Sequence, residues 1–405
     1  MNQSKFSIPI IFTLLSLFTI SFVLSLFLLQ FCGGLIFIIW LLEKWNEKKN
    51  MFDIIFLSIF LFGFIRLLSI IFSEFPSSSI ESLYKEALFY VVLVSLPFYL
   101  KTLDKGKLLK LVQIFILGAV AMSLVGITRF FIGDVNRAEA ISSSYTVFSA
   151  YLMVALGMTL YFPGGMQRKL SLLYKPLTVF ILFSGIVASL GRINIAIAVL
   201  MFISAIIFKR INPKQLIVLG MLFSVFGLLY LNHRTELISE RVTNITQLSD
   251  RDIIWKGAVH LVYKHPLLGF GPRTFKDIFP FTKQFKDRGI GGWHNDFLQI
   301  YFESGLLGLL TFILLLIVTI GISINQIMNK KIDTDFRSLS VSVLVSVSGL
   351  ILSSLTAGFI TSVVLSILFA FLLSLLSRIE GEGKISLKEK SFILICKSLK
   401  IQLPK

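Results

Sequence analysis

Cysteine and charge are both scarce in this sequence. Its 405 residues include only two cysteines, and charged residues make up 15% of the chain. Cys32 lies in an apolar run and Cys396 in a basic segment near the C-terminus, so the two are not expected to pair. The sequence therefore predicts neither a disulfide nor a cysteine-based metal site.

Apolar side chains dominate the composition instead. They make up 55% of the chain, which contains 40 phenylalanines and has a mean hydropathy of +0.85. Because about 20 apolar residues cross the hydrocarbon core of a bilayer, we expect an all-α polytopic membrane protein with about 12 transmembrane helices. The candidate spans cover approximately residues 6–22, 24–42, 53–72, 87–100, 108–127, 141–162, 176–190, 193–208, 215–231, 297–323, 338–355 and 358–377.

Lys and Arg are distributed unevenly between the two sets of loops. They concentrate at the N-terminus, in the loops after every second span and in the C-terminal segment. The short loops of the other set contain only Lys85, Arg129, Arg137 and Arg192. Since Lys- and Arg-rich loops stay in the cytoplasm, both termini are expected inside. The net charge of +17 then reflects topology and contact with anionic lipids, and is weak evidence for nucleic acid.

One outer connection is much longer than the others, residues 232–296 between the ninth and tenth spans. It carries all four histidines of the chain, so titratable side chains concentrate there. The expected organisation is membrane helices one to nine over 1–231, this mainly helical outer loop with the catalytic region over 232–296, helices ten to twelve over 297–377, and a basic cytoplasmic tail over 378–405. The first apolar run lacks a small-residue cleavage site and is expected to be an anchor.

Inside the loop, the run SDRDIIWKGAVHLVYKHP predicts a helix with both ends marked. Ser249 and Asp252 resemble a capping box, and Pro266 is expected to end the helix. Arg251 falls in the first turn, where free N–H groups favour an anion; the alternative is a solvated arginine. The following HPLLGFGP run, residues 265–272, predicts a tight turn whose glycines adopt positive φ.

The stretch WHNDFLQIYFESGLLG, residues 293–308, places His294 where polar residues meet an apolar helix. Asn295 and Asp296 suit a helix N-cap. On a continuous helix, Gly305 and Gly308 would lie on the face below His294, where small residues let another helix or a lipid chain approach. A lone histidine at such a position is more often a satisfied surface residue, so a functional role depends on its neighbours.

Arginines supply such neighbours. Arg192 is in the only polar break of residues 176–208, and Arg137 lies in another outer connection. Arg66 lies within the third span near its outer end, where a charge is costly unless it is paired or lines a cavity. Each alone can reach lipid phosphate, but together they predict a pocket for a phosphate-bearing lipid. Glu303, by contrast, is expected to form a structural ion pair.

The loop motifs resemble those of a known family. His294, Asn295, Gly305 and Gly308 match the H-N-x9-G-x2-G pattern associated with O-antigen ligases. The wider run from DRDIIW through HPLLGFGP to HNDFLQIYFESGLLG resembles the conserved region of the O-antigen ligase and polymerase superfamily, which includes some bacterial protein O-oligosaccharyltransferases. The spans and the single large loop extend this resemblance, more loosely, to the whole chain.

The resemblance implies an inverting glycan transfer without metal or cofactor. The donor would be an O-antigen glycan on undecaprenyl diphosphate and the acceptor the lipid A core oligosaccharide. The partners would thus be these two substrates and membrane lipids, at the periplasmic face of the bacterial inner membrane. His294 matches the family's base, with Asn295, Gly305 and Gly308 in support. The implied diphosphate-binding residues are Arg192, Arg251, Arg137, Arg66 and, as an alternative loop arginine, Arg241.

Several other functions remain open at this stage. An O-antigen polymerase uses the same donor, and a protein O-oligosaccharyltransferase belongs to the same superfamily. Asp250 and Asp252 spell a D-x-D motif of metal-dependent glycosyltransferases, although Arg251 between them would oppose a cation. Many spans and an intramembrane arginine also suit a transporter or flippase, but such proteins often show internal repeats, and we find none in this sequence.

Overall fold

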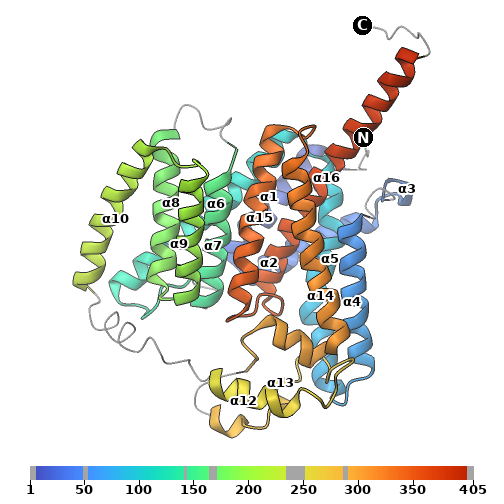
Figure 1. Ribbon diagram of the computed structural model, residues 1–405, viewed down its shortest axis with the longest axis vertical. Helices are drawn as coiled ribbons and strands as arrows, with labels where there is room; N and C mark the ends of the chain where they lie inside the picture. Colours follow the sequence, from blue (N-terminus) through green and yellow to red (C-terminus); the bar gives the residue numbers. More distant parts are fainter. Residues whose placement is uncertain are drawn as a thin grey trace.

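The helices of the chain form one bundle. A computed structural model describes residues 6–48, 53–140, 144–163, 171–233, 251–285 and 291–398, and within these ranges the regular structure is helical, without strands. Figure 1 shows the long helices side by side, with the short helices of the large loop gathered at one end. The all-α prediction is therefore confirmed.

Each apolar run expected to span the membrane coincides with a helix. Within the described ranges, seven helices are long and apolar enough to cross a membrane, and five others are apolar but only 10–17 residues long. A multi-pass membrane protein is thus supported, while the count of twelve spans stays a prediction. The helices are α1 (Ile8–Leu24), α2 (Leu26–Leu41), α4 (Ile54–Ile71), α5 (Pro76–Thr102), α6 (Lys105–Ile132), α7 (Tyr145–Tyr161), α8 (Ser171–Ala188), α9 (Arg192–Ile207), α10 (Pro213–His233), α14 (Asp296–Met328), α15 (Thr334–Ser354) and α16 (Val363–Ser398). A four-residue helix, α3 (Trp45–Lys48), follows α2.

Two helix boundaries differ most from the expected spans. α5 begins at Pro76, well before residue 87, because a proline is favoured in the first turn and the Ser82 hydroxyl donates to Ser79 O within the helix. α16 continues to Ser398, so no change of secondary structure marks the expected start of the tail at residue 378. The length of an apolar run predicts which residues can lie in a bilayer. Polar residues at either end of the run can extend the helix beyond these residues.

Close helix contacts place α7 and α15 side by side. The Ser346 hydroxyl of α15 donates to the Val154 carbonyl oxygen of α7 at 3.0 Å. A Cβ at Gly157 would lie 2.7 Å from the Ser346 hydroxyl oxygen, so only glycine permits this approach. Nearly every residue from Phe148 to Tyr161 is buried, which makes α7 a central helix of the bundle.

The large loop has a hydrophobic core of its own. Its helices α12 (Arg251–Leu261), α13 (Phe275–Ile278) and η3 (Thr282–Phe285) lie at the end of the bundle opposite to the projecting α16 (Figure 1). α12 ends before the expected Pro266, and Ser249 of the expected capping box lies outside the described residues. The buried loop core consists of Ile254, Ala258, Leu261, Phe270, Phe275, Phe279, Trp293 and Phe302.

The helix after the histidine is interrupted at Gly305. This residue has φ +65° and ψ −166°, and the backbone of the HPLLGFGP turn pairs with the interruption. Phe270 N donates to Phe302 O at 2.8 Å, and Leu306 N donates to Pro266 O at 2.7 Å. Gly269 in the turn has the expected positive φ, +69°. The prediction of a glycine turn is therefore confirmed.

The expected continuous glycine face is wrong. A Cβ on Gly305 would lie 2.2 Å from the Leu267 carbonyl, so this glycine accommodates the backbone of the loop turn and not a second helix or a lipid chain. A Cβ on Gly308 would meet Ser304 of the same helix at 2.3 Å. The prediction assumed a continuous helix through Gly305. A glycine within a helical pattern can equally mark an interruption of the helix.

Candidate active site

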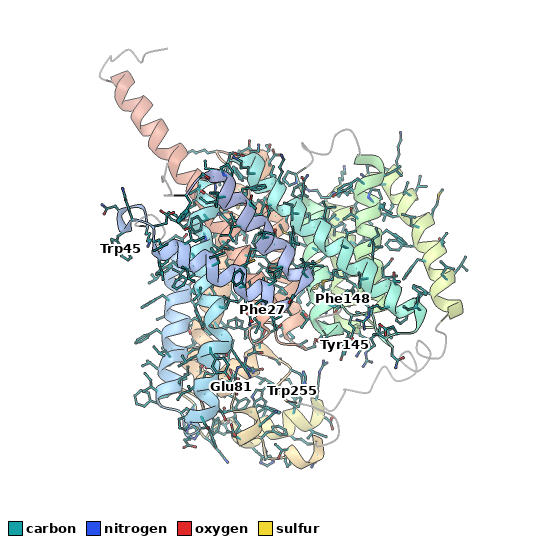
Figure 2. All side chains as sticks on the ribbon, turned by 180° about the vertical axis from the view of Figure 1, so that it is seen from behind. Phe27, Trp45, Glu81, Tyr145, Phe148 and Trp255 are labelled. Carbon is teal, nitrogen blue, oxygen red and sulfur yellow. The ribbon has the colours of Figure 1, made fainter. Side chains whose placement is uncertain are left out.

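A polar cavity of about 640 Å³ lies where the bundle meets the loop helices. It is bounded by the start of α7, the α8–α9 junction, α12, the start of α14 and the turn between α15 and α16. Figure 2 shows Tyr145 at this end of the bundle. The lining residues that matter here are Arg137, Tyr145, Arg192, Arg251, His294 and Gln299.

His294 is held between two anchored neighbours. The ring of Trp293, which is 1% exposed, stacks on Phe302 in the loop core with 4.0 Å between ring centroids. Asn295 caps α14 as expected, because its Oδ1 accepts from Phe297 N at 2.9 Å and from Leu298 N at 3.1 Å. His294 itself has φ +50° and precedes the helix, so its expected place on the helical face is corrected. This positive φ is costly for any residue other than glycine. Residues with such strained backbone are often found at functional sites.

The cavity favours the neutral form of this histidine. The His294 side chain is exposed to the cavity, but the protein around it lowers the pKa of the imidazole. Burial is the larger cause, and the positive charge of Arg251 is the second. A neutral imidazole at pH 7 can accept a proton.

Arg251 stands in the first turn of α12 and reaches across to the bundle. Its Nη2 donates to the Thr356 carbonyl oxygen at 2.9 Å, in the turn between α15 and α16. Burial, and next the charge of Arg192, lower the pKa of the Arg251 guanidinium. The side chain is half-buried and bonded to the bundle, which argues against the alternative of a solvated arginine.

Arg192 is the first residue of α9 and follows a sharp turn between α8 and α9. Leu190 has φ +56°, α9 starts without a side-chain cap, and the residues of this helix start, Gly191 to Asn194, line the cavity. The arginine and the helix start both favour an anion. The buried Asn194 fixes this helix start: its Nδ2 donates to the Ser149 hydroxyl at 2.7 Å, and Ser353 donates to its Oδ1 at 2.8 Å.

Arg137 also reaches the cavity, with its guanidinium held against the Tyr145 ring, 3.3 Å from the centroid. Its Nε donates to Ser189 O at 3.2 Å and its Nη2 to Leu190 O at 3.0 Å. These bonds tie its loop to the α8–α9 junction. Arg137 therefore shapes the cavity wall as well as contributing charge.

Arg66 does not lie on this cavity, which corrects its expected place among the clustered arginines. Its guanidinium forms ion pairs with Glu86 at 2.8 Å and with Glu303 at 3.0 Å, and all three side chains are largely shielded from solvent. Glu303 thereby has the structural ion pair expected for it. Arg241, the alternative loop arginine, lies outside the described residues, as does Asp250 of the D-x-D motif.

Asp296 was noted in the sequence only as a residue suited to a helix N-cap, and its contact with the α15–α16 turn was not expected. Asp296 is fully buried in the first turn of α14, and its Oδ2 accepts from Phe359 N at 2.7 Å. Together with the bond from Asn295 Nδ2 to Leu355 O at 3.2 Å, it fastens the α15–α16 turn to the start of α14. Tyr145 and Gln299 were not singled out from the sequence. A first-turn aspartate next to a capping asparagine was the available signal for Asp296.

The fold and the cavity define a class. The chain is a multi-pass helical membrane protein with a polar cavity at one end of its bundle, where three arginines and a histidine meet. Such a cavity is suited to an anionic group beside a proton acceptor.

Comparison with known families makes this assignment more specific. Residues 177–313 match the family model described as O-antigen ligase, which supports the resemblance to the O-antigen ligase superfamily predicted from the sequence. The family includes ligases and polymerases, glycosyltransferase-like enzymes of O-antigen processing. The matched region contains Arg192, Arg251, His294 and Gln299 but not Arg137. No curated protein matches the chain in sequence.

Proposed function

We propose that this protein is an O-antigen ligase, which transfers a glycan from undecaprenyl diphosphate to a hydroxyl of the lipid A core oligosaccharide. The observation that carries the proposal is the meeting of His294 with Arg137, Arg192 and Arg251 at one cavity. These residues come from four separate parts of the chain. Their meeting suits a reaction in which a proton leaves one substrate while negative charge develops on the other.

The arginines are assigned to the donor diphosphate. Guanidinium groups bind phosphate oxygens through two parallel hydrogen bonds and remain charged throughout the reaction. The first-turn amides of α9 add donors beside Arg192. As the bond between the anomeric carbon and the diphosphate breaks, the leaving group takes the electron pair, and these fixed donors stabilise its charge.

His294 is assigned as the general base. Its lowered pKa keeps the imidazole neutral at pH 7, so it can take the proton of the acceptor hydroxyl as the new bond to the anomeric carbon forms. One displacement of this kind inverts the anomeric configuration. Holding both lipid-linked substrates in one cavity removes much of the entropic cost of their encounter.

The cavity is assigned to the periplasmic face of the inner membrane. The uneven distribution of Lys and Arg supports cytoplasmic termini. The loop helices lie at the end of the bundle opposite to the projecting C-terminal end of α16, which fits a loop on the other side of the membrane (Figure 1).

A transfer assay with purified components tests the proposal. The wild-type chain and His294→Ala are reconstituted with a defined undecaprenyl-diphosphate-linked glycan and lipid A core. We expect the wild type to extend the lipid A core and His294→Ala to do so at a rate lower by a factor of about 10²–10⁴. Arg192→Gln should raise the KM for the donor. Loss of transfer in EDTA with recovery in manganese would contradict the arginine mechanism.

The same assay separates the alternatives. If the wild type elongates a second lipid-carried glycan and leaves lipid A core unmodified, the protein is a polymerase. If the wild type moves the carrier lipid across vesicle membranes but transfers no glycan, and His294→Ala abolishes this movement, the protein is a transporter.

A further inference from the structure

A hydrogen-bonded network extends from the cavity into the bundle through Gln299. Its Nε2 donates to Glu303 Oε1 at 2.8 Å, one helical turn along α14. The same oxygen accepts from Arg273 N at 2.9 Å, and the other oxygen of Glu303 accepts from Arg66 at 3.0 Å. Glu303 therefore joins the cavity wall to both the loop turn and α4.

This network decides which end of the Gln299 amide faces the cavity. A carboxylate engaged by an arginine accepts hydrogen bonds and donates none, so the amide must turn its NH₂ group toward Glu303. Its oxygen then points the other way. A Cβ on Gly292, another cavity residue, would lie 3.8 Å from Gln299 Oε1, which places that oxygen on the cavity side.

An acceptor oxygen at this position complements the rest of the site. Arg137, Arg192 and Arg251 have donors only, and so cannot accept the hydrogen of a hydroxyl. Gln299 can, and it follows His294 by five residues on the same segment. From this geometry we propose that Gln299 Oε1 binds a hydroxyl of the acceptor sugar, beside the hydroxyl that His294 deprotonates, and that Glu303 is the positioning residue that orients the amide. This inference rests on the proposed glycan transfer.

Steady-state kinetics of the reconstituted chain test the assignment. The KM values for lipid A core and for the undecaprenyl-diphosphate-linked donor are measured separately. Gln299→Leu removes the acceptor oxygen with little change in volume, so we expect the KM for lipid A core to rise about five- to ten-fold, as for one lost neutral hydrogen bond. The KM for the donor should stay within about two-fold.

A double-mutant cycle tests the role of Glu303. Glu303→Gln frees the Gln299 amide to turn, while Arg66 keeps its ion pair with Glu86. We expect this change alone to raise the KM for lipid A core and to have no further effect when Gln299 is already Leu. A merely structural role for Glu303 would raise that KM equally in both backgrounds. If Glu303→Gln does not fold, Gln299→Leu still decides whether Gln299 binds the acceptor, which is the premise of a positioning role for Glu303.

The outcomes separate this inference from the proposed function. An active wild type with an unchanged KM for lipid A core in Gln299→Leu, or with a raised KM for the donor, would overturn the assignment of Gln299 and leave the ligase proposal standing. A wild type that transfers no glycan would overturn both.

Discussion

The His294 imidazole and the Arg251 guanidinium line the same cavity and interact electrostatically. Burial and then the charge of Arg251 lower the pKa of His294, while burial and then the charge of Arg192 lower the pKa of Arg251. The His294 imidazole, the proposed base, therefore lies in a field of positive charge. That field keeps the imidazole neutral and at the same time favours an anionic substrate.

The pH dependence of transfer should report this relationship. Activity requires neutral His294, so kcat/KM should fall as the pH drops through its pKa, with a midpoint below the ordinary 6.5 of histidine. Arg251→Gln removes a positive charge, which raises that pKa and should move the midpoint to higher pH. Arg137→Gln is the control, with a lower rate but an unmoved midpoint. An equal shift in both variants would contradict the pairing of His294 with Arg251.

Removal of the base should affect the rate and leave the fold intact. We expect His294→Gln to lower kcat by a factor of about 10²–10⁴ with little change in thermal unfolding, because the side chain is exposed to the cavity. The matched control is His260→Gln, since His260 packs against Phe281 in the loop. Similar losses in the two variants would mean that the loop histidines act structurally.

The break in α14 should tolerate only glycine. Gly305→Ala forces a Cβ against the Leu267 carbonyl at a positive φ, so we expect it to destabilise the protein by about 2–4 kcal/mol. Gly321→Ala in the same helix meets nothing within 4 Å and should be neutral or stabilising by about 0.5–1 kcal/mol. Thermal unfolding in detergent measures both. Equal stability of the two variants would mean that the loop turn does not depend on this break.

The Arg66 ion pairs should matter for stability and not for donor binding. Arg66→Met leaves Glu86 and Glu303 buried without their cation, at an expected cost of about 3–5 kcal/mol. Lys85→Met breaks the more exposed pair with Glu81 and should cost less than about 1 kcal/mol. A stable Arg66→Met protein with a raised KM for the donor would instead support the original assignment of Arg66 to the diphosphate.

Much of the site could be predicted because its signals are local. Asn295 has the side chain that a helix N-cap requires, and the glycines of HPLLGFGP suit positive φ. Arg192 and Arg251 were expected at the same outer interface because each stands where an apolar or helical run begins, and both line the cavity. Arg66 also lies near the outer end of its helix, but position along a helix does not specify the neighbour that its side chain faces.

The sequence by itself determined the class of protein and the positions of its long helices, because apolar length and cap chemistry are properties of short segments. Only the tertiary structure decided which charged side chains line the cavity and which are held in ion pairs elsewhere. Arg66 is neutralised by carboxylates 20 and 237 residues away, and Gly305 is a break because a distant loop backbone pairs with it. Partners so far apart in the chain meet only through folding, and a buried charge or an unpaired carbonyl acquires its role from the group it meets.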